Sequence, residues 1–396
     1  MTDRDTGIGA MAGVHPVGAV PPSATRTLWR VQAMRGAAAL MVVIGHSQSA
    51  AARIVTDAGG RFARSTIVPW GAGVDLFFVL SGFIIVHASG RLFGRAGARG
   101  DFVRRRLVRI VPLYWLVTTL FLALLAAAAW KGGDRFPGGV AILASYAFIP
   151  ADTYGDGRLF PVFDLGWTLN YEMLFYALFA LVVPLPRRRA LAMAGLLLVA
   201  AVAIGGIVPV SPAAWFWTRP IILDFGLGVA VGACVARAIV LAPPVRIALA
   251  VVGAAVLLAD PLHVFDGPVG VTVANDWPRV LAAGLPIAAV LAAAVLGPEP
   301  PMPRVLLPVA VIGDASYSLY LVHPVALIAA EKLAQKLPLV RAAAGWQLVL
   351  AMVLAALAIA IAVHRGVERP MTAALGRRRA GARSAPPRAV AAHQGD

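Results

Sequence analysis

Arg35 and His46 lie eleven residues apart in an otherwise apolar segment, MRGAAALMVVIGHSQS, which covers residues 34–49. Eleven residues at 100° each complete about three turns of an α-helix, so the two side chains share one helix face. Their separation along the axis is roughly 16 Å, about half the thickness of a bilayer's hydrocarbon core. A guanidinium binds anions, and an imidazole accepts a proton near neutral pH. The spacing therefore predicts an anion-binding group near one membrane surface and a titratable base at depth.

A second pair of basic residues, Arg106 and Arg109, begins another apolar segment. Residues three apart lie on the same side of a helix, and guanidinium groups bind phosphates in a bidentate manner. Both positions are therefore candidates for binding a phosphorylated substrate. The alternative is that arginines here only set the orientation of the chain in a membrane, which is our interpretation of Arg104 and Arg105.

Two carboxylates occupy apolar surroundings. Asp75 lies in GVDLFFVLSGFII and Glu172 in GWTLNYEMLFY. Polar groups at membrane depth are costly and mark functional sites by default. Asp75 could orient the imidazole of His46, as a carboxylate does in a catalytic triad, or could interact with a helix dipole. Glu172 is expected either to pair with an arginine or to act as an acid or base.

Hydroxyl groups are concentrated late in the chain, in the segment GDASYSLYLVHP over residues 313–324. These side chains could line a polar cavity, or they could form hydrogen bonds between helices. Aromatic residues also flank Glu172, as expected at a membrane interface. The candidates for contacting a substrate are Tyr317, Ser318 and Trp167.

The composition is that of a membrane protein. Of 396 residues, 60% are hydrophobic and only 14% are charged, against roughly 25% in soluble domains. The net charge of +16 is explained by loops that orient the chain in a membrane, since no basic patch with interleaved aromatic residues suggests nucleic-acid binding. The single cysteine excludes an intramolecular disulfide, and no group of residues has the spacing of metal ligands.

Apolar segments of about the length of a membrane span recur along the chain, which predicts an all-α polytopic protein. Arginines between residues 91 and 109 place that loop, and hence both termini, in the cytoplasm. We expect disordered cytoplasmic residues at 1–30, a transmembrane domain over 31–370 and a basic disordered cytoplasmic tail over 371–396. Ten spans are expected, at about residues 33–52, 70–89, 107–130, 166–184, 190–208, 220–240, 245–260, 278–297, 305–330 and 342–364.

Six sequence blocks, in order, resemble the acyltransferase 3 family of membrane-bound O-acyltransferases, and within it the exopolysaccharide-production branch. They are MRGAAALMVVIGH, GVDLFFVLSGFII, RRRLVRIVPLYW, GWTLNYEMLFY, DASYSLYLVHP and VERP. The resemblance covers about residues 30–370. It implies ten membrane helices, an acyl-CoA donor, usually acetyl-CoA, entering from the cytoplasm, and a hydroxyl acceptor that is commonly on a sugar. By the same resemblance, Arg35 and His46, Arg106 and Arg109, and Glu172 match the family's functional positions.

The sequence thus predicts an integral O-acyltransferase of the bacterial inner membrane, with acyl-CoA as co-substrate and no bound cofactor. Its acceptor is a surface or exported polysaccharide or the lipid-linked precursor. His46 acts as the general base or forms an acyl-histidine, Arg35, Arg106 and Arg109 hold the CoA phosphates, and Asp75 and Glu172 assist His46 or bind the acceptor. The alternative is a transporter or flippase for an anionic or glycan substrate, in which the same arginines bind the cargo.

Overall fold

The computed structural model describes residues 28–132, 136–265, 275–338 and 344–383, and in these ranges every regular element is helical. Residues 1–27 and 384–396, where disorder is expected, lie outside the described residues, and the first helix begins at Trp29. The elements are α1 (Trp29–Asp57), η1 (Trp70–Ala72), α2 (Gly73–Ala88), α3 (Ala98–Trp130), α4 (Gly139–Tyr146), η2 (Asp164–Gly166), α5 (Trp167–Val182), α6 (Arg187–Ile207), α7 (Pro212–Trp217), η3 (Pro220–Ile222), α8 (Leu223–Ala236), α9 (Pro243–Ala259), α10 (Trp277–Arg279), η4 (Val280–Gly284), α11 (Leu285–Val295), η5 (Arg304–Leu306), α12 (Leu307–Asp314), α13 (Ser316–Lys336), α15 (Gly345–Val363), η6 (His364–Glu368) and α16 (Arg369–Arg383).

Seven helical segments in the described part of the chain are long and apolar enough to cross a membrane. An eighth arises if α12 and α13, bent by 72° at their junction, are one broken span. Two shorter apolar helices cover Pro220–Ala236 and Pro243–Ala259. The all-helical polytopic architecture that the sequence predicts is therefore confirmed, and a helix lies in each of the ten expected ranges.

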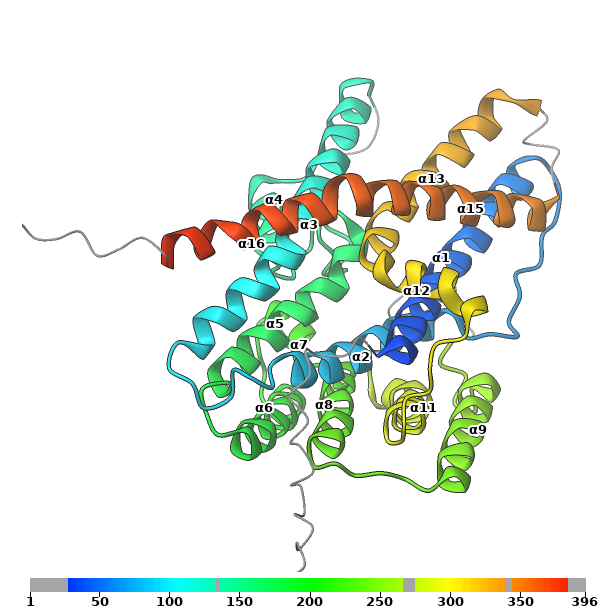
Figure 1. Cartoon of the computed structure of the whole chain (residues 1–396). Coiled ribbons are helices and arrows are strands. Elements are labelled where there is room, and N and C mark those ends of the chain that lie inside the picture. The colour runs from blue at the N-terminus through cyan, green and yellow to red at the C-terminus, as the bar shows by residue number, and fades with distance from the viewer. Residues whose placement is uncertain (1–27, 133–135, 266–274, 339–343, 384–396) are drawn as a thin grey trace, which may run out of the picture.

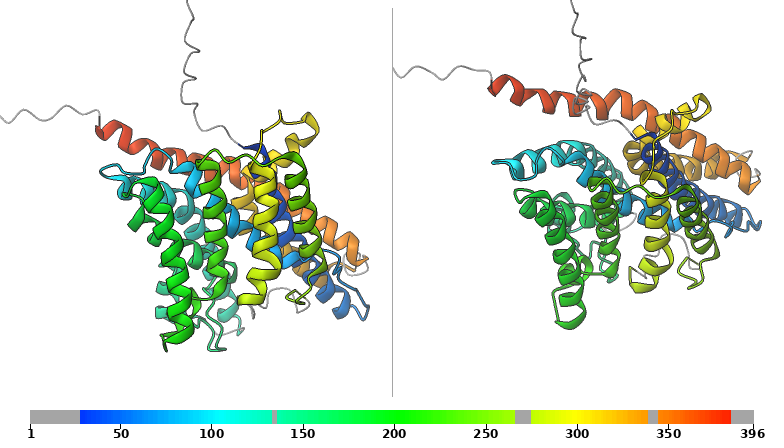
Figure 2. Two further views of the ribbon diagram at one scale, coloured as in Figure 1. Left: turned by 90° about the horizontal axis from the view of Figure 1, so that it is seen from below. Right: turned by 60° about the horizontal axis from the view of Figure 1, so that its bottom comes forward.

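Four of the helices form a row, and this row packs against a second group of helices that includes α1 and α2. α6, α8, α11 and α9 stand side by side along one edge of the molecule, seen almost end-on in Figure 1 and from the side in Figure 2. α2 packs behind α8, and α1 contacts α2, α12, α13 and α15. α1 and α2, which carry several of the candidate site residues, therefore lie in the interior of the bundle.

Glycines allow α2 and α8 to approach each other closely. A Cβ atom added at Gly228 would lie 1.9 Å from the carbonyl oxygen of Val79, and one added at Gly82 would lie 2.1 Å from that of Phe225. Small residues at helix crossings of this kind let backbones meet in membranes. The contact holds α2 in place along the wall of the site described below.

We expect Gly228→Ala to destabilise the protein by about 1–3 kcal/mol, because a clash with backbone atoms forces the two helices apart. Thermal unfolding of the purified protein in detergent measures the effect. Gly226→Ala is the matched control, since its Cβ would meet only a Leu198 methyl group, at 3.4 Å. Equal unfolding temperatures for the two variants would contradict the close-packing argument.

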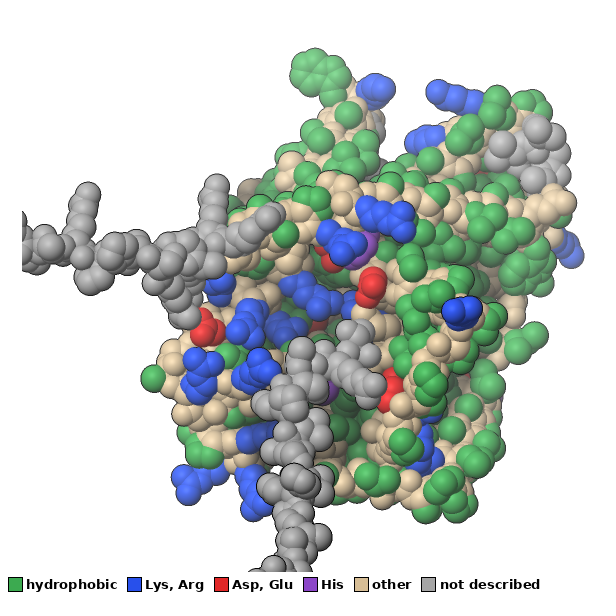
Figure 3. Space-filling model, viewed as in Figure 1, with side chains coloured by type: hydrophobic (Ala, Val, Ile, Leu, Met, Phe, Trp, Pro, Cys, Tyr) green, Lys and Arg blue, Asp and Glu red, His purple; other side chains and the backbone are tan. Residues whose placement is uncertain are grey.

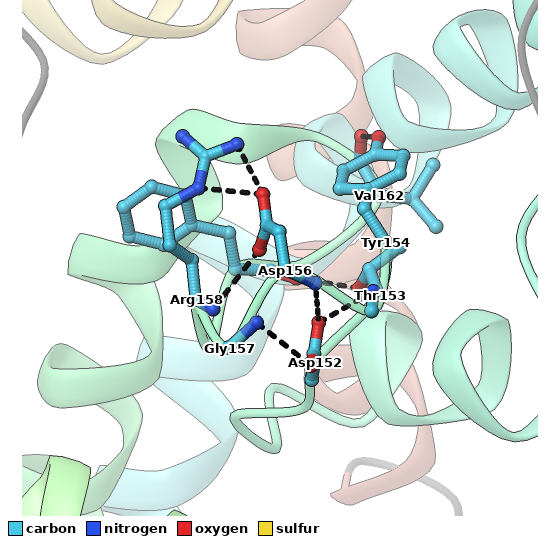
Figure 4. Close-up of polar contacts among 9 residues, drawn as sticks. Asp152, Thr153, Tyr154, Asp156, Gly157, Arg158 and Val162 are labelled. Carbon is cyan, nitrogen blue, oxygen red and sulfur yellow. Dashed lines mark hydrogen bonds and ion pairs between the residues drawn. The ribbon is translucent and has the colours of Figure 1, made fainter.

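The polar loop before α5 is ordered by its own acidic side chains (Figure 4). The carboxylate of Asp152 accepts hydrogen bonds from the backbone amides of Gly155, at 2.7 Å, and Gly157, at 3.0 Å. Asp156 accepts a hydrogen bond from the guanidinium of Arg158, which holds the pKa of that carboxyl below its usual value. These hydrogen bonds order the loop that leads into α5.

Two segments differ from the sequence expectation. The span expected over residues 305–330 is interrupted at Ala315, where α12 ends and α13 begins in a new direction. The tail expected to be disordered from residue 371 instead continues as α16 to Arg383, in a stretch rich in alanine and arginine, both good helix formers. Arg104 of α3 donates a hydrogen bond to the carbonyl oxygen of Leu375, which attaches α16 to α3.

Candidate active site

A cavity with about 770 Å³ of empty space, part of it open to solvent, lies between α1, α2, α3, α5 and α13. The α2 wall is mostly apolar, from Val74 to Ile84, and includes Phe77 and Phe78. Polar groups converge from the other helices. They are Arg35, Arg106, Arg109, Thr168, Glu172, Tyr176, Ser316, Tyr317 and Tyr320.

Arg35 is held toward the cavity by neighbours on two helices. Its guanidinium donates one hydrogen bond to Gln32 on the preceding turn of α1 and one to Ser316 at the start of α13, both at 2.9 Å. Gln32 in turn donates to Asp314, the last residue of α12, at 2.5 Å. The break between α12 and α13 therefore supplies the groups that orient Arg35.

Arg106 and Arg109 lie one turn apart on α3, and both line the cavity, as their shared helix face predicts. The Arg106 guanidinium lies over the rings of Phe102 and Tyr176, at 5.7 and 5.9 Å from their centroids. Its buried Nε atom has no hydrogen-bond partner among the residues that the structure describes. Arg105 on the same helix is exposed. Figure 3 shows Lys and Arg side chains gathered over the face where α2, α3 and α5 meet.

Glu172 is the carboxylate of the cavity. It accepts a hydrogen bond from Ser81 of α2 at 2.9 Å and a short one from Tyr176, one turn later on α5. Tyr317, also in the cavity wall, donates to the carbonyl oxygen of Ile110 at 2.7 Å. Glu172 thus lines the same cavity as the three arginines, and Ser81 and Tyr176 hold one of its carboxylate oxygens in place.

His46 does not line the cavity and instead pairs with His323 of α13. The His46 Nδ1 and His323 Nε2 atoms are 2.9 Å apart. His323 is completely buried, whereas His46 is partly exposed. Tyr320, the last cavity residue along α13, has its ring centroid 6.3 Å from that of His323. The histidine pair therefore begins one turn of α13 beyond the cavity wall.

Asp75 has a different partner from the one suggested by the sequence. Its two carboxylate oxygens accept hydrogen bonds from Nε and Nη2 of Arg279, at 2.8 and 2.9 Å, and both side chains are buried. Asp224 of α8, also fully buried, lies beside this pair. The described contacts of Asp75 therefore make it part of an interhelical ion pair, and none of them joins it to His46.

Two other sequence candidates also lie outside the cavity. Ser318 donates a hydrogen bond to Glu368 at 2.6 Å, and Glu368 is further bonded to His364 at 2.8 Å. Trp167 is buried, with its ring packed against Phe78. Of the three candidates for substrate contact, Tyr317 alone lies in the cavity wall.

The sequence indicated His323 only as one of the polar side chains of residues 313–324 that could line a cavity, and it gave no indication of a role for Arg279. Both find their partners across more than 200 residues of chain. A signal for His323 was present, because the first and ninth expected spans run in the same direction and bring the two histidines to similar depth. No comparable signal joins Arg279 to Asp75.

The described helices thus form a polytopic bundle of the kind that membrane proteins build, with an arginine-lined cavity that is partly open to solvent. Residues 28–365 match the model of an acyltransferase domain, so the chain belongs to this acyltransferase family and is an O-acyltransferase.

Among curated proteins, the chain is 36% identical over 308 residues to the exopolysaccharide production protein ExoZ of Rhizobium meliloti, covering 76% of this chain and 89% of that protein. It is 28% identical over 337 residues to the acyltransferase MdmB of Streptomyces mycarofaciens, covering 77% of this chain and 82% of that protein. No solved structure matches the chain.

Proposed function

We propose that this membrane acyltransferase transfers an acyl group, in the first instance acetyl, from acyl-CoA to a hydroxyl of a surface or exported polysaccharide or of its lipid-linked precursor. The observation that carries this proposal is the cavity in which Arg35, Arg106 and Arg109 converge on an apolar interior. Arginine forks suit the phosphates of CoA, and the apolar α2 wall suits its pantetheine arm and the acyl group. The relative named for exopolysaccharide production supports a glycan acceptor.

In the proposed reaction His46 accepts the proton of the acceptor hydroxyl as its oxygen attacks the thioester carbonyl. A carbon–oxygen bond forms, the carbon–sulfur bond breaks, and the CoA thiolate takes up the proton. The acyl group reaches His46 by passing Tyr320, which lines the cavity and neighbours His323. An acyl-histidine intermediate is the alternative within the same site.

Glu172 and Tyr317 contact the substrate from inside the cavity in this proposal. The carboxylate of Glu172 is held by Ser81 and Tyr176, so it offers hydrogen-bond acceptors in a fixed position. We assign it to the acceptor hydroxyls or to support of the base. Asp75 acts at a distance, through the ion pair that positions α2.

Arg106→Ala or Arg109→Ala is expected to weaken acyl-CoA binding, because each removes a charge-assisted contact worth roughly 1.5–3 kcal/mol, or about 10- to 150-fold in affinity. Titration of the purified protein with acyl-CoA in lipid nanodiscs measures the loss. Arg105→Ala is the control, since Arg105 is exposed on the same helix. Equal losses of affinity at all three positions would indicate an effect of overall positive charge and would refute specific binding of the CoA phosphates by Arg106 and Arg109.

We further propose ten spans in the bacterial inner membrane with both termini in the cytoplasm, supported by the helices found in all ten expected ranges and by the arginines of the loop before α3. Reporter fusions after Asp156 should report the periplasm, and fusions after Arg188 the cytoplasm. The reverse pattern would refute this orientation.

Release of free thiol tests the proposed reaction. The purified protein in nanodiscs is mixed with acetyl-CoA and with polysaccharide isolated from the cells that make this protein. We expect thiol release that depends on the polysaccharide, with acyl ester appearing on the glycan. A transporter, the alternative that the family assignment disfavours, would leave the thioester intact.

A further inference from the structure

His46 and His323 meet edge to edge. Their ring planes are within 8° of parallel, with centroids 5.2 Å apart, and their nearest nitrogens are 2.9 Å apart. Stacked rings would keep all atoms at a van der Waals separation of about 3.5 Å or more. The contact is therefore a hydrogen bond in the common plane of the rings, which requires a single proton between His46 Nδ1 and His323 Nε2.

The other nitrogen of His323 decides which ring supplies this proton. His323 Nδ1 lies 3.1 Å from the carbonyl oxygen of Leu319, one turn earlier on α13. A carbonyl oxygen only accepts hydrogen bonds, so Nδ1 of His323 carries the proton of that ring. In the neutral imidazole Nε2 is then an acceptor, and the proton between the rings belongs to Nδ1 of His46.

We infer that His323 is a positioning residue that holds His46 in the Nδ1–H tautomer and leaves its Nε2 lone pair available to a hydroxyl. This inference rests on the proposed role of His46 as the base. His323 takes the part that a carboxylate plays in a Ser-His-Asp triad, but as a neutral acceptor. It orients the ring without placing an unpaired charge in the interior, where His323 is completely buried.

The arrangement also suits the step after proton transfer. When His46 takes the hydroxyl proton on Nε2, it becomes an imidazolium with protons on both nitrogens. Its Nδ1–H remains bonded to His323, whose own Nδ1–H remains bonded to Leu319. Proton uptake therefore breaks no existing hydrogen bond. A second positive charge on α1, that of Arg53, is compensated because Arg53 forms an ion pair with Glu331 of α13 at 2.6 Å.

Two substitutions at the same position test the inference. His323→Gln retains an oxygen that accepts from His46 Nδ1, whereas His323→Met fills similar space without a strong acceptor. We expect His323→Met to lower kcat by roughly tenfold or more, with KM for acyl-CoA unchanged and an altered pH profile of kcat. His323→Gln should restore most of the rate. Equal rates for both variants and the unmodified protein would overturn the inference.

Nitrogen-15 NMR of histidine-labelled protein reads the tautomer directly. The His46 signals are assigned by their loss in His46→Gln. We expect protonated Nδ1 and unprotonated Nε2 at neutral pH in the unmodified protein, and this result does not require the His323 variants to fold. An Nε2–H tautomer would refute the inference while leaving the acyltransferase proposal intact. If His46→Gln kept its activity, the proposed base would fail, and the tautomer measurement would still stand.

Discussion

His46→Gln is expected to abolish transfer of the acyl group while leaving acyl-CoA binding intact. Glutamine retains hydrogen-bonding groups of similar reach but does not accept a proton at neutral pH. Loss of a general base removes on the order of 10²–10⁴ in rate. Donor binding should persist because the three arginines of the cavity belong to a separate set of contacts from the histidine pair. Single-turnover transfer of labelled acetyl and direct titration with acetyl-CoA measure the two effects separately.

His87→Gln is the matched control for this prediction. His87 lies near the end of α2, in parallel contact with Phe83 rather than with another histidine. The His87→Gln substitution should leave the rate of acyl transfer within a few-fold of that of the unmodified protein. Near-normal turnover in His46→Gln would mean that the imidazole is structural, and would move the role of base to Glu172, the carboxylate that faces the cavity.

Arg279→Met is expected to destabilise the fold by about 3–5 kcal/mol, because it leaves the buried carboxyl group of Asp75 without its ionic partner. Asp224, buried beside the pair, adds a second carboxyl group to the same apolar surroundings. The affected contacts join α2 to the helix beginning at Trp277, so the loss should appear as global unfolding. Thermal unfolding in one detergent at fixed protein concentration measures it.

The double variant Asp75→Leu with Arg279→Met separates the effect of the lost ion pair from the effect of changed side-chain packing. Replacing both members of a buried pair by apolar residues is often neutral, whereas removing one leaves an uncompensated charge. We therefore expect the double variant to recover a large part of the lost stability. A double variant as unstable as Arg279→Met would show that packing around Arg279, rather than the ion pair, holds these helices.

The positions of the helices follow from the sequence because length and hydropathy alone determine what can span a bilayer. The exact ends do not follow, and α3 begins at Ala98, whereas the span was expected from about residue 107. The arginines in between are good helix formers, so the helix extends beyond the apolar stretch. The 72° break at Ala315 was also not predicted, since the apolar run continues through it.

The candidate site was likewise predicted from the sequence only in part. Arg106 and Arg109 share a helix face by simple geometry, and both line the cavity. Arg35 and His46 share a face of α1, but Arg35 lies in the cavity and His46 beyond it. Partners far apart in sequence depend on tertiary packing, which periodicity does not encode. For that reason the pairing of Asp75 with Arg279 emerged only from the structure.

Mass spectrometry of the cell's surface polysaccharide tests the central claim most directly. Polysaccharide is compared from cells that make the protein, from cells that lack it, and from cells that make His46→Gln at equal abundance in the membrane. We predict acyl esters on the glycan with the unmodified protein, and their loss in the other two strains. Glycans of identical acylation in all three strains would contradict the account.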